Sequence, residues 1–303
     1  MRHGRRLFAF TFLLPPLALY AVFVISPYLQ AFQISLTDWR GLSPEYEYVG
    51  PENFRLLLHD QYVWNALKNN AIILVALPVV TILLALFFAS MLSVGGRAGK
   101  AGVTGVRGAA LYRIVYFFPQ VLSVAIIGVL WKQVYAPNSG ILNGFLRAVG
   151  LDALAKPWLG DPALAFWCVL AVMVWSNVGF YVVLFNAAMQ SIPREIYEAA
   201  LLDGAGRAAT LARITVPLVW DTIQVAWVYL AILAIDGFAL VQIITEGGPG
   251  NSSDVIGLRL YTNAMGDFKF GYASAIGVAM FFLTLSVAVV ALRATRRERI
   301  ELS

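Results

Sequence analysis

Residues 74–91, LVALPVVTILLALFFASM, are the stretch of this sequence that decides its fold. They contain no Asp, Glu, Lys or Arg, and the uncharged run around them extends from Asn69 to Gly96. About 20 apolar residues in a helix cross the hydrocarbon core of a bilayer. Pro78 is tolerated in such a helix because neighbouring helices can satisfy the backbone groups that it frees. The stretch therefore predicts a transmembrane helix.

Five other stretches along the chain are similarly poor in charge. They run from Leu7 to Thr37, between Arg113 and Lys132, from Pro162 to Pro193, from Thr222 to Thr245 and between Lys269 and Arg293. The chain as a whole is 60% hydrophobic and 13% charged, with a mean hydropathy of +0.74, whereas soluble domains carry about 25% charged residues. We therefore predict an all-α, polytopic membrane protein with about six transmembrane helices. The first stretch is longer than the apolar part of a signal peptide, so we expect an uncleaved helix.

Basic residues orient the six predicted spans. An even number of spans places both termini on one side, together with segments 94–113 and 191–219. That side carries 14 of the 22 Lys and Arg residues, whereas the other side carries eight, together with ten acidic residues. The 14 are Arg2, Arg5, Arg6, Arg97, Lys100, Arg107, Arg113, Arg194, Arg207, Arg213, Arg293, Arg296, Arg297 and Arg299. Because Lys and Arg concentrate in cytoplasmic loops, we predict cytoplasmic N- and C-termini. We attribute the net charge of +5 to this orientation in the membrane and not to nucleic-acid binding.

The predicted spans divide the chain into three parts. Residues 1–64 hold the first helix and the first outer segment, residues 65–293 hold a core of five helices, and residues 294–303 form a cytoplasmic tail. No catalytic or metal-binding pattern stands out: Cys168 is the single cysteine, and no G-x-x-x-x-G-K-S/T phosphate loop occurs. We therefore expect no enzyme activity, no metal and no cofactor.

The cytoplasmic segment 191–219 reads SIPREIYEAALLDGAGRAATLARITVPLV. Pro193 suits the start of a helix, and Gly204 can take the left-handed conformation that ends one. A second helix is expected from about Gly206 until Pro217 stops it. The segment predicts two short helices with a bend outside the bilayer, where small residues allow close approach. An ordinary amphipathic connector would have the same physical pattern.

The residue pattern within this segment is more specific. Glu198-Ala199-Ala200, then Asp203-Gly204-Ala205, then Ile214 and Pro217-Leu218, resembles the EAA loop of binding-protein-dependent ABC importer permeases. The resemblance implies the type I importer permease fold, a bacterial cytoplasmic membrane and a loop that docks in a separate ATPase. The implied coupling residues are Glu198, Ala199, Ala200, Asp203, Gly204, Ala205 and Pro217. The implied partners are a second permease, two ATPase copies and an extracytoplasmic sugar-binding protein.

Other stretches resemble the sugar-transporting branch of that family. They are Tyr112-Arg113 through Phe118-Pro119, Trp175-Ser176-Asn177-Val178-Gly179, Thr245-Glu246-Gly247-Gly248-Pro249 and Phe270-Gly271-Tyr272-Ala273-Ser274-Ala275. The resemblance implies sugar as the cargo and an outer loop, with Gly247, Gly248 and Pro249, that faces the binding protein. The branch usually has Asp at the position of Ala239, whereas this chain has a carboxylate three residues earlier, at Asp236.

Polar side chains inside the predicted spans are the candidates for a substrate pathway, because such groups usually face a cavity or a partner helix. The candidates are Asn177, Tyr181, Asn186, Tyr229 and Asp236. Each has a plainer explanation: the asparagines can bond between helices, and the tyrosines can belong to packing or to an interfacial belt. Two functional alternatives stay open, namely an ABC importer permease for a non-sugar solute and a secondary transporter, although no repeated halves are visible.

Overall fold

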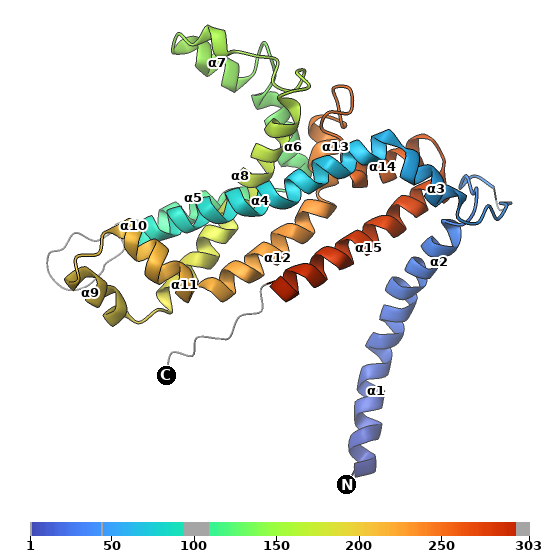
Figure 1. Ribbon diagram of the computed structural model, residues 1–303, viewed down its shortest axis with the longest axis horizontal. Coiled ribbons are helices and arrows are strands. Elements are labelled where there is room, and N and C mark those ends of the chain that lie inside the picture. The colour runs from blue at the N-terminus through green and yellow to red at the C-terminus, as the bar shows by residue number, and fades with distance from the viewer. Residues whose placement is uncertain (1, 44, 94–108, 295–303) are drawn as a thin grey trace. The chain divides into compact units, whose positions relative to one another are not determined.

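The described part of the chain folds as helices joined by loops (Figure 1). The structure is a computed structural model that describes residues 2–43, 45–93 and 109–294. An isolated antiparallel bridge joins Thr37 to Tyr48. The predicted all-α fold class is confirmed.

The helices follow one another in a simple order. They are α1 (Arg2–Tyr20), α2 (Ser26–Ile34), α3 (Glu52–His59), α4 (Gln61–Ser93), α5 (Ala109–Val121), α6 (Val124–Val134), α7 (Ile141–Ala148), α8 (Ala165–Gln190), α9 (Arg194–Leu202), α10 (Arg207–Thr210), α11 (Val216–Leu218), α12 (Trp220–Asp236), α13 (Phe238–Ile244), α14 (Ile256–Tyr261) and α15 (Phe270–Ala294). Wider π-helical turns occur at Ala21–Ile25, Leu211–Thr215 and Thr262–Gly266, and a 3₁₀ turn occurs at Asp152–Leu154.

Some residues of the topology argument lie outside the described residues. They are Arg97, Lys100, Arg107, Arg296, Arg297 and Arg299. The expected cytoplasmic tail lies there too, apart from residue 294.

Four helical stretches among the described residues are long and apolar enough to cross a bilayer. They are Phe10–Ile34, Gln61–Leu92, Ala165–Gln190 and Phe270–Val290. Two bent pairs pass the same test as pairs, namely Val115–Val121 with Val124–Val134 and Arg207–Leu218 with Trp220–Asp236. Counting each bent pair as one span gives six, in agreement with the prediction of about six.

Two of the predicted spans are broken, which the sequence did not predict. The third bends by 113° between α5 and α6. The fifth, expected from Thr222 to Thr245, is interrupted after Asp236, where α12 ends and α13 begins after Gly237. Hydropathy measures only the solvent that a stretch prefers, and apolar residues continue across both breaks. Hydropathy therefore does not report where the backbone changes direction.

The expectation that Pro217 ends a helix is also wrong. α11 continues through Pro217 to Leu218, and the chain bends by 77° only after that point. A proline ring crowds the carbonyl four residues before it. The π-helical turn Leu211–Thr215 directly precedes α11, and within it the backbone N–H of Val216 bonds to the oxygen of Leu211, five residues back. The wider turn shifts the bonding register, so the helix can pass through the proline.

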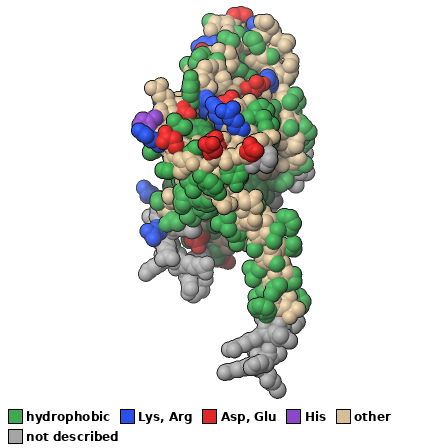
Figure 2. Space-filling model, turned by 90° about the vertical axis from the view of Figure 1, so that its right-hand side faces the viewer, with side chains coloured by type: hydrophobic (Ala, Val, Ile, Leu, Met, Phe, Trp, Pro, Cys, Tyr) green, Lys and Arg blue, Asp and Glu red, His purple; other side chains and the backbone are tan. Residues whose placement is uncertain are grey.

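The contacts divide the chain into two units. The first contains residues 1–64 and 259–283, and the second contains residues 65–258 and 284–303. Within the first unit, the ring of Phe32 lies 6.2 Å from that of Phe281. In the same unit, apolar side chains of α1 and α2 are exposed from Phe10 onward (Figure 2), as expected for a helix whose solvent is lipid.

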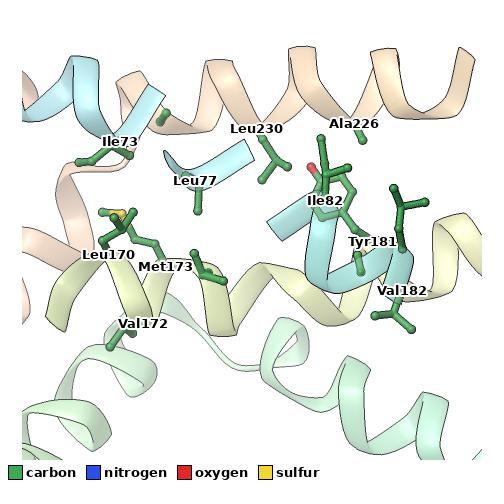
Figure 3. Packing of buried hydrophobic residues seen from close by; sticks show 14 of the residues in the cluster. Ile73, Leu77, Ile82, Leu170, Val172, Met173, Tyr181, Val182, Ala226 and Leu230 are labelled. Carbon is green, nitrogen blue, oxygen red and sulfur yellow. The ribbon is translucent and has the colours of Figure 1, made fainter. Parts of the chain in front are cut away.

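Side chains from α4, α8 and α12 form the core of the second unit. Figure 3 shows Leu77 of α4, Met173 of α8 and Leu230 of α12 among the buried residues of this cluster. The α4 helix passes through Pro78 without a break, as predicted. The core of the second unit therefore joins two unbroken spans, α4 and α8, to the first part of the broken fifth span.

Candidate functional site

A proline and a capping serine lie at the break between α5 and α6. Pro119 lies in the last turn of α5. Ser123 then takes an extended conformation and caps α6, accepting the backbone N–H of Ile126 on its hydroxyl at 3.4 Å. Serine is among the residues that most favour this capping position. One helix therefore ends and another begins in the middle of an apolar stretch.

The break between α12 and α13 lies in the same unit. Asp236 is the last residue of α12, and Gly237 joins the two helices. A β-carbon at Gly237 would lie 2.9 Å from the carbonyl oxygen of Leu233, so a larger residue would crowd the preceding turn. The carboxylate of Asp236 therefore sits where a helix stops.

Both breaks open onto one cavity of about 330 Å³. Its lining comes from α5, α6, α8, α12 and α13, and consists of Pro119, Gln120, Leu122, Val124, Ile127, Met173, Ser176, Asn177, Leu233, Asp236, Gly237, Ala239 and Leu240. Sites for small molecules typically occupy about 300–1,000 Å³, with mostly apolar walls and a few polar groups. The cavity matches that description.

Four lining residues carry polar side chains, and they come from three helices. Gln120 lies on α5, Ser176 and Asn177 lie on α8, and Asp236 ends α12. The Asn177 amide nitrogen donates to the carbonyl oxygen of Met173 at 2.8 Å. Amide and carboxylate groups can exchange hydrogen bonds with hydroxyl groups. The cavity can therefore hold a small polar molecule.

Two of the predicted pathway candidates, Asn177 and Asp236, thus lie at one cavity. Ala239, where the sugar branch usually has Asp, lines the same cavity as Asp236. The carboxylate of Asp236 therefore lies at the same cavity as position 239, where the sugar branch usually has its Asp. Gln120 was not among the candidates predicted from the sequence. A polar side chain directly after Pro119 in an apolar stretch was the available signal.

The other three candidates do not line this cavity. Tyr181 and Asn186 are buried in α8, and the Asn186 amide oxygen accepts a hydrogen bond from Gln190 at 2.6 Å. Tyr229 is 68% exposed on α12. It belongs to a stripe of exposed residues on one face of that helix, namely Asp221, Val225, Tyr229, Ile232 and Asp236. The stripe ends at the cavity.

Segment 191–219 has the bend that its sequence predicts. α9 ends at Leu202, and Gly204 follows with a φ of +75°. The backbone N–H of Ala205 reaches back to the oxygen of Ala200 at 2.9 Å, which is the bonding pattern of a left-handed helix cap. The Tyr197 hydroxyl lies 3.4 Å from that of Thr215 and ties α9 to the turn after α10. The two predicted helices and the bend between them are present, although the second helix continues through Pro217 to Leu218.

Small and apolar residues are exposed at the tip of this bend, beside two acidic ones. Glu198, Ala199, Asp203 and Gly204 are exposed, whereas Ala200 is buried and Ala205 is half-buried. Leu202 is 90% exposed, although burying a leucine stabilises by about 1.5–3 kcal/mol. Nothing in the sequence singled out Leu202 as a surface residue. Its exposure beside small residues suits contact with another protein.

The loop after α13, which the sequence analysis places on the outer side, is tightly wound. Glu246, Gly247, Gly250 and Asn251 all have positive φ values, between 53° and 81°. The Ser253 hydroxyl oxygen lies within 2.7 Å of the Gly248 oxygen and braces the turn. Of the residues expected to face a binding protein, Gly247 is buried, and Gly248 and Pro249 are half-buried. Glu246 and Gly250 are the exposed residues of the turn.

The sequence of this chain matches a known family. Residues 57–300 match the family profile described as the binding-protein-dependent transport system inner membrane component. The chain belongs to this family. The predicted resemblance to its permeases is therefore confirmed.

Individual relatives agree with this assignment. The diacetylchitobiose uptake system permease protein NgcF of Streptomyces coelicolor is 45% identical over 93% of this chain and 80% of its own length. The multiple sugar-binding transport system permease protein MsmF of Streptococcus mutans is 30% identical over 95% of this chain and 94% of its own. A bacterial ABC transporter involved in alginate import has the same fold, with a TM-score of 0.81, 22% identity and 97% coverage of both chains.

Proposed function

We propose that this family member is the permease subunit of an ATP-driven importer that moves an oligosaccharide across the bacterial cytoplasmic membrane. The carrying observation is the cavity between two broken spans, lined by Gln120, Asn177 and Asp236. Ionisable and amide groups at membrane depth are costly unless they serve a pathway or a partner. Sugar hydroxyls supply the hydrogen bonds that such groups need. The names of NgcF and MsmF point to the same cargo class.

A second permease would complete the pathway. The exposed stripe on α12, which includes Tyr229 and ends at Asp236, would face it. Tyr181 and Asn186, buried in α8, would hold the helix that carries Asn177. The core 65–293 would perform transport, and the first helix, within 1–64, would add a span.

ATP hydrolysis would occur in two copies of a separate ATPase subunit. Both termini and segment 191–219 would lie in the cytoplasm, where the bend with Glu198, Asp203 and Gly204 would dock in the ATPase. Leu202 would fill an apolar pocket of that partner. ATP binding would close the ATPases, move this bend and open the cavity outward, and hydrolysis would reset it.

An extracytoplasmic sugar-binding protein would deliver the cargo. Glu246 and Gly250 would meet it, while Gly247, Gly248 and Pro249 set the path of the turn. Release would then place the sugar above the cavity.

Uptake of a labelled sugar panel tests the proposal. A strain without this gene is complemented with the wild type or with Gly204→Pro, and diacetylchitobiose leads the panel. We expect uptake with the wild type and at least a tenfold loss with Gly204→Pro, because proline cannot adopt a φ of +75°. Uptake that survives without any ATPase partner would indicate a secondary transporter. Uptake of a non-sugar solute alone would remove the cargo assignment.

A further inference from the structure

Two asparagines on α4 hold the backbone of the outer loop. The Asn65 amide nitrogen donates to the oxygen of Asn251 at 2.6 Å. The Asn69 amide nitrogen donates to the oxygens of Ser252 and Asp254, at 3.0 and 2.8 Å. Positions four residues apart share a helix face. Because all three acceptors are backbone carbonyls, these bonds hold the path of the loop whatever side chains it carries.

A third asparagine, Asn70, joins this loop to the broken span. Its amide nitrogen donates to the oxygen of Ala234 at 3.1 Å, and its amide oxygen accepts the backbone N–H of Ile256 at 2.8 Å. Asn70 is only 3% exposed. One partner is a carbonyl and the other is an N–H, so the amide fits in one orientation only.

Both partners are backbone groups that a helix end leaves unsatisfied. The last four carbonyls of a helix have no partner within it, and Ala234 lies in the last turn of α12. The first four N–H groups of a helix are likewise unpaired, and Ile256 begins α14. A buried polar group without a partner is strongly destabilising. One side chain therefore satisfies two helix ends at once.

We infer that Asn70 is the positioning residue that ties the outer loop to the cavity, an inference that rests on the proposed function. Ala234 lies two residues before Asp236, which lines the cavity. A displacement of Ile256 by a docked binding protein therefore passes through one rigid amide to the end of α12. Asn70 acts on the cavity through Ala234 and does not itself line it.

Asn70→Asp tests the link at one end. The carboxylate still accepts the N–H of Ile256, but it places an acceptor against the acceptor oxygen of Ala234. Asn53→Asp is the matched control. Asn53 is also buried and donates to two backbone carbonyls, Ser35 and Thr37, at 2.9 and 2.7 Å.

Hydrogen exchange in the purified transporter complex measures the link without any cargo. In Asn70→Asp we expect exchange in peptide 233–240 to become at least tenfold faster. In Asn53→Asp we expect that peptide to exchange as in the wild type. If Asn70→Asp lowers the yield of complex, Asn70→Ser is measured in its place with the same expectation. Wild-type exchange of 233–240 in the Asn70 variant, or equal acceleration by both variants, overturns the inference.

Stimulation of ATP hydrolysis by a diacetylchitobiose-loaded binding protein provides the second measurement. For Asn70→Asp we expect the maximal stimulated rate to fall at least fivefold, while the half-saturating concentration of binding protein stays within twofold. Asn53→Asp should leave both the maximal stimulated rate and the half-saturating concentration unchanged. A rise of the half-saturating concentration alone would place Asn70 in docking only and overturn the inference. Absence of stimulation in the wild type would instead count against the proposed cargo, and the exchange result would still judge Asn70.

Discussion

Gly179→Ala is the most sensitive test of the packing that holds the cavity. Gly179 lies in α8, where the helix crosses α5, and a β-carbon at this position would overlap the carbonyl group of Tyr116. The third-nearest atom, the backbone nitrogen of Phe117, would lie 3.1 Å away. Small residues allow membrane helices to approach this closely. One added methyl group therefore pushes directly against the backbone of α5.

The size of the effect follows from these contacts. Carbon atoms pack best about 3.5–4.0 Å apart, so the two helices must separate by roughly an ångström or more. Extra groups in a well-packed core cost about 1–3 kcal/mol. We place Gly179→Ala near the upper end, at about 3 kcal/mol, because the obstacle is backbone and not a flexible side chain. The melting temperature should fall by roughly 5–10 °C.

Gly144→Ala is the matched control, because a β-carbon at Gly144 of α7 would meet no atom within 4 Å. Alanine favours a helix over glycine by about 1 kcal/mol, so this variant should melt at or above the wild-type temperature. Thermal unfolding of the detergent-purified protein, followed by size-exclusion chromatography, measures both. A Gly179→Ala protein that melts with the wild type would refute the close α5–α8 contact. An equal fall in the melting temperature of the Gly144→Ala control would also refute it.

Three further predictions concern the tip of the bend, the cavity and the break. Leu202→Ser should weaken binding of the ATPase subunit about tenfold in a binding assay. Leu42→Ser, which also changes an exposed leucine, is the control and should bind as the wild type does. Equal affinities of the two variants would contradict docking through Leu202. Asp236→Asn should lower sugar uptake roughly 10–100-fold at unchanged complex yield, because hydrogen bonds to charged groups contribute about 1.5–3 kcal/mol. The exposed Asp152→Asn is its control, and normal uptake by Asp236→Asn would remove the carboxylate from the pathway. Ser123→Ala should cost about 1 kcal/mol in thermal unfolding through loss of the α6 cap, and an unchanged melting temperature would show that the break does not depend on this cap.

Local sequence features predicted the elements but not the partners of their ends. Gly204 predicted the bend of segment 191–219 because a left-handed conformation is a property of that residue and its neighbours. Asn177 and Asp236 were found because polar groups in apolar stretches are rare. Gln120 and Asn70 were missed, since polarity alone does not tell a residue that lines a cavity from one that satisfies a helix end.

The sequence by itself determined that this chain is a polytopic helical membrane protein, because hydropathy is a property of each stretch and its solvent. Only the tertiary structure decided that two of the predicted spans break and that both breaks open onto one cavity. The physical reason is that a helix end inside the membrane leaves backbone groups that no residue of the same helix can satisfy. Ser123 caps α6 locally, but other partners come from distant segments, as Asn70 does for Ala234 across 164 residues, and only the folded chain brings those together.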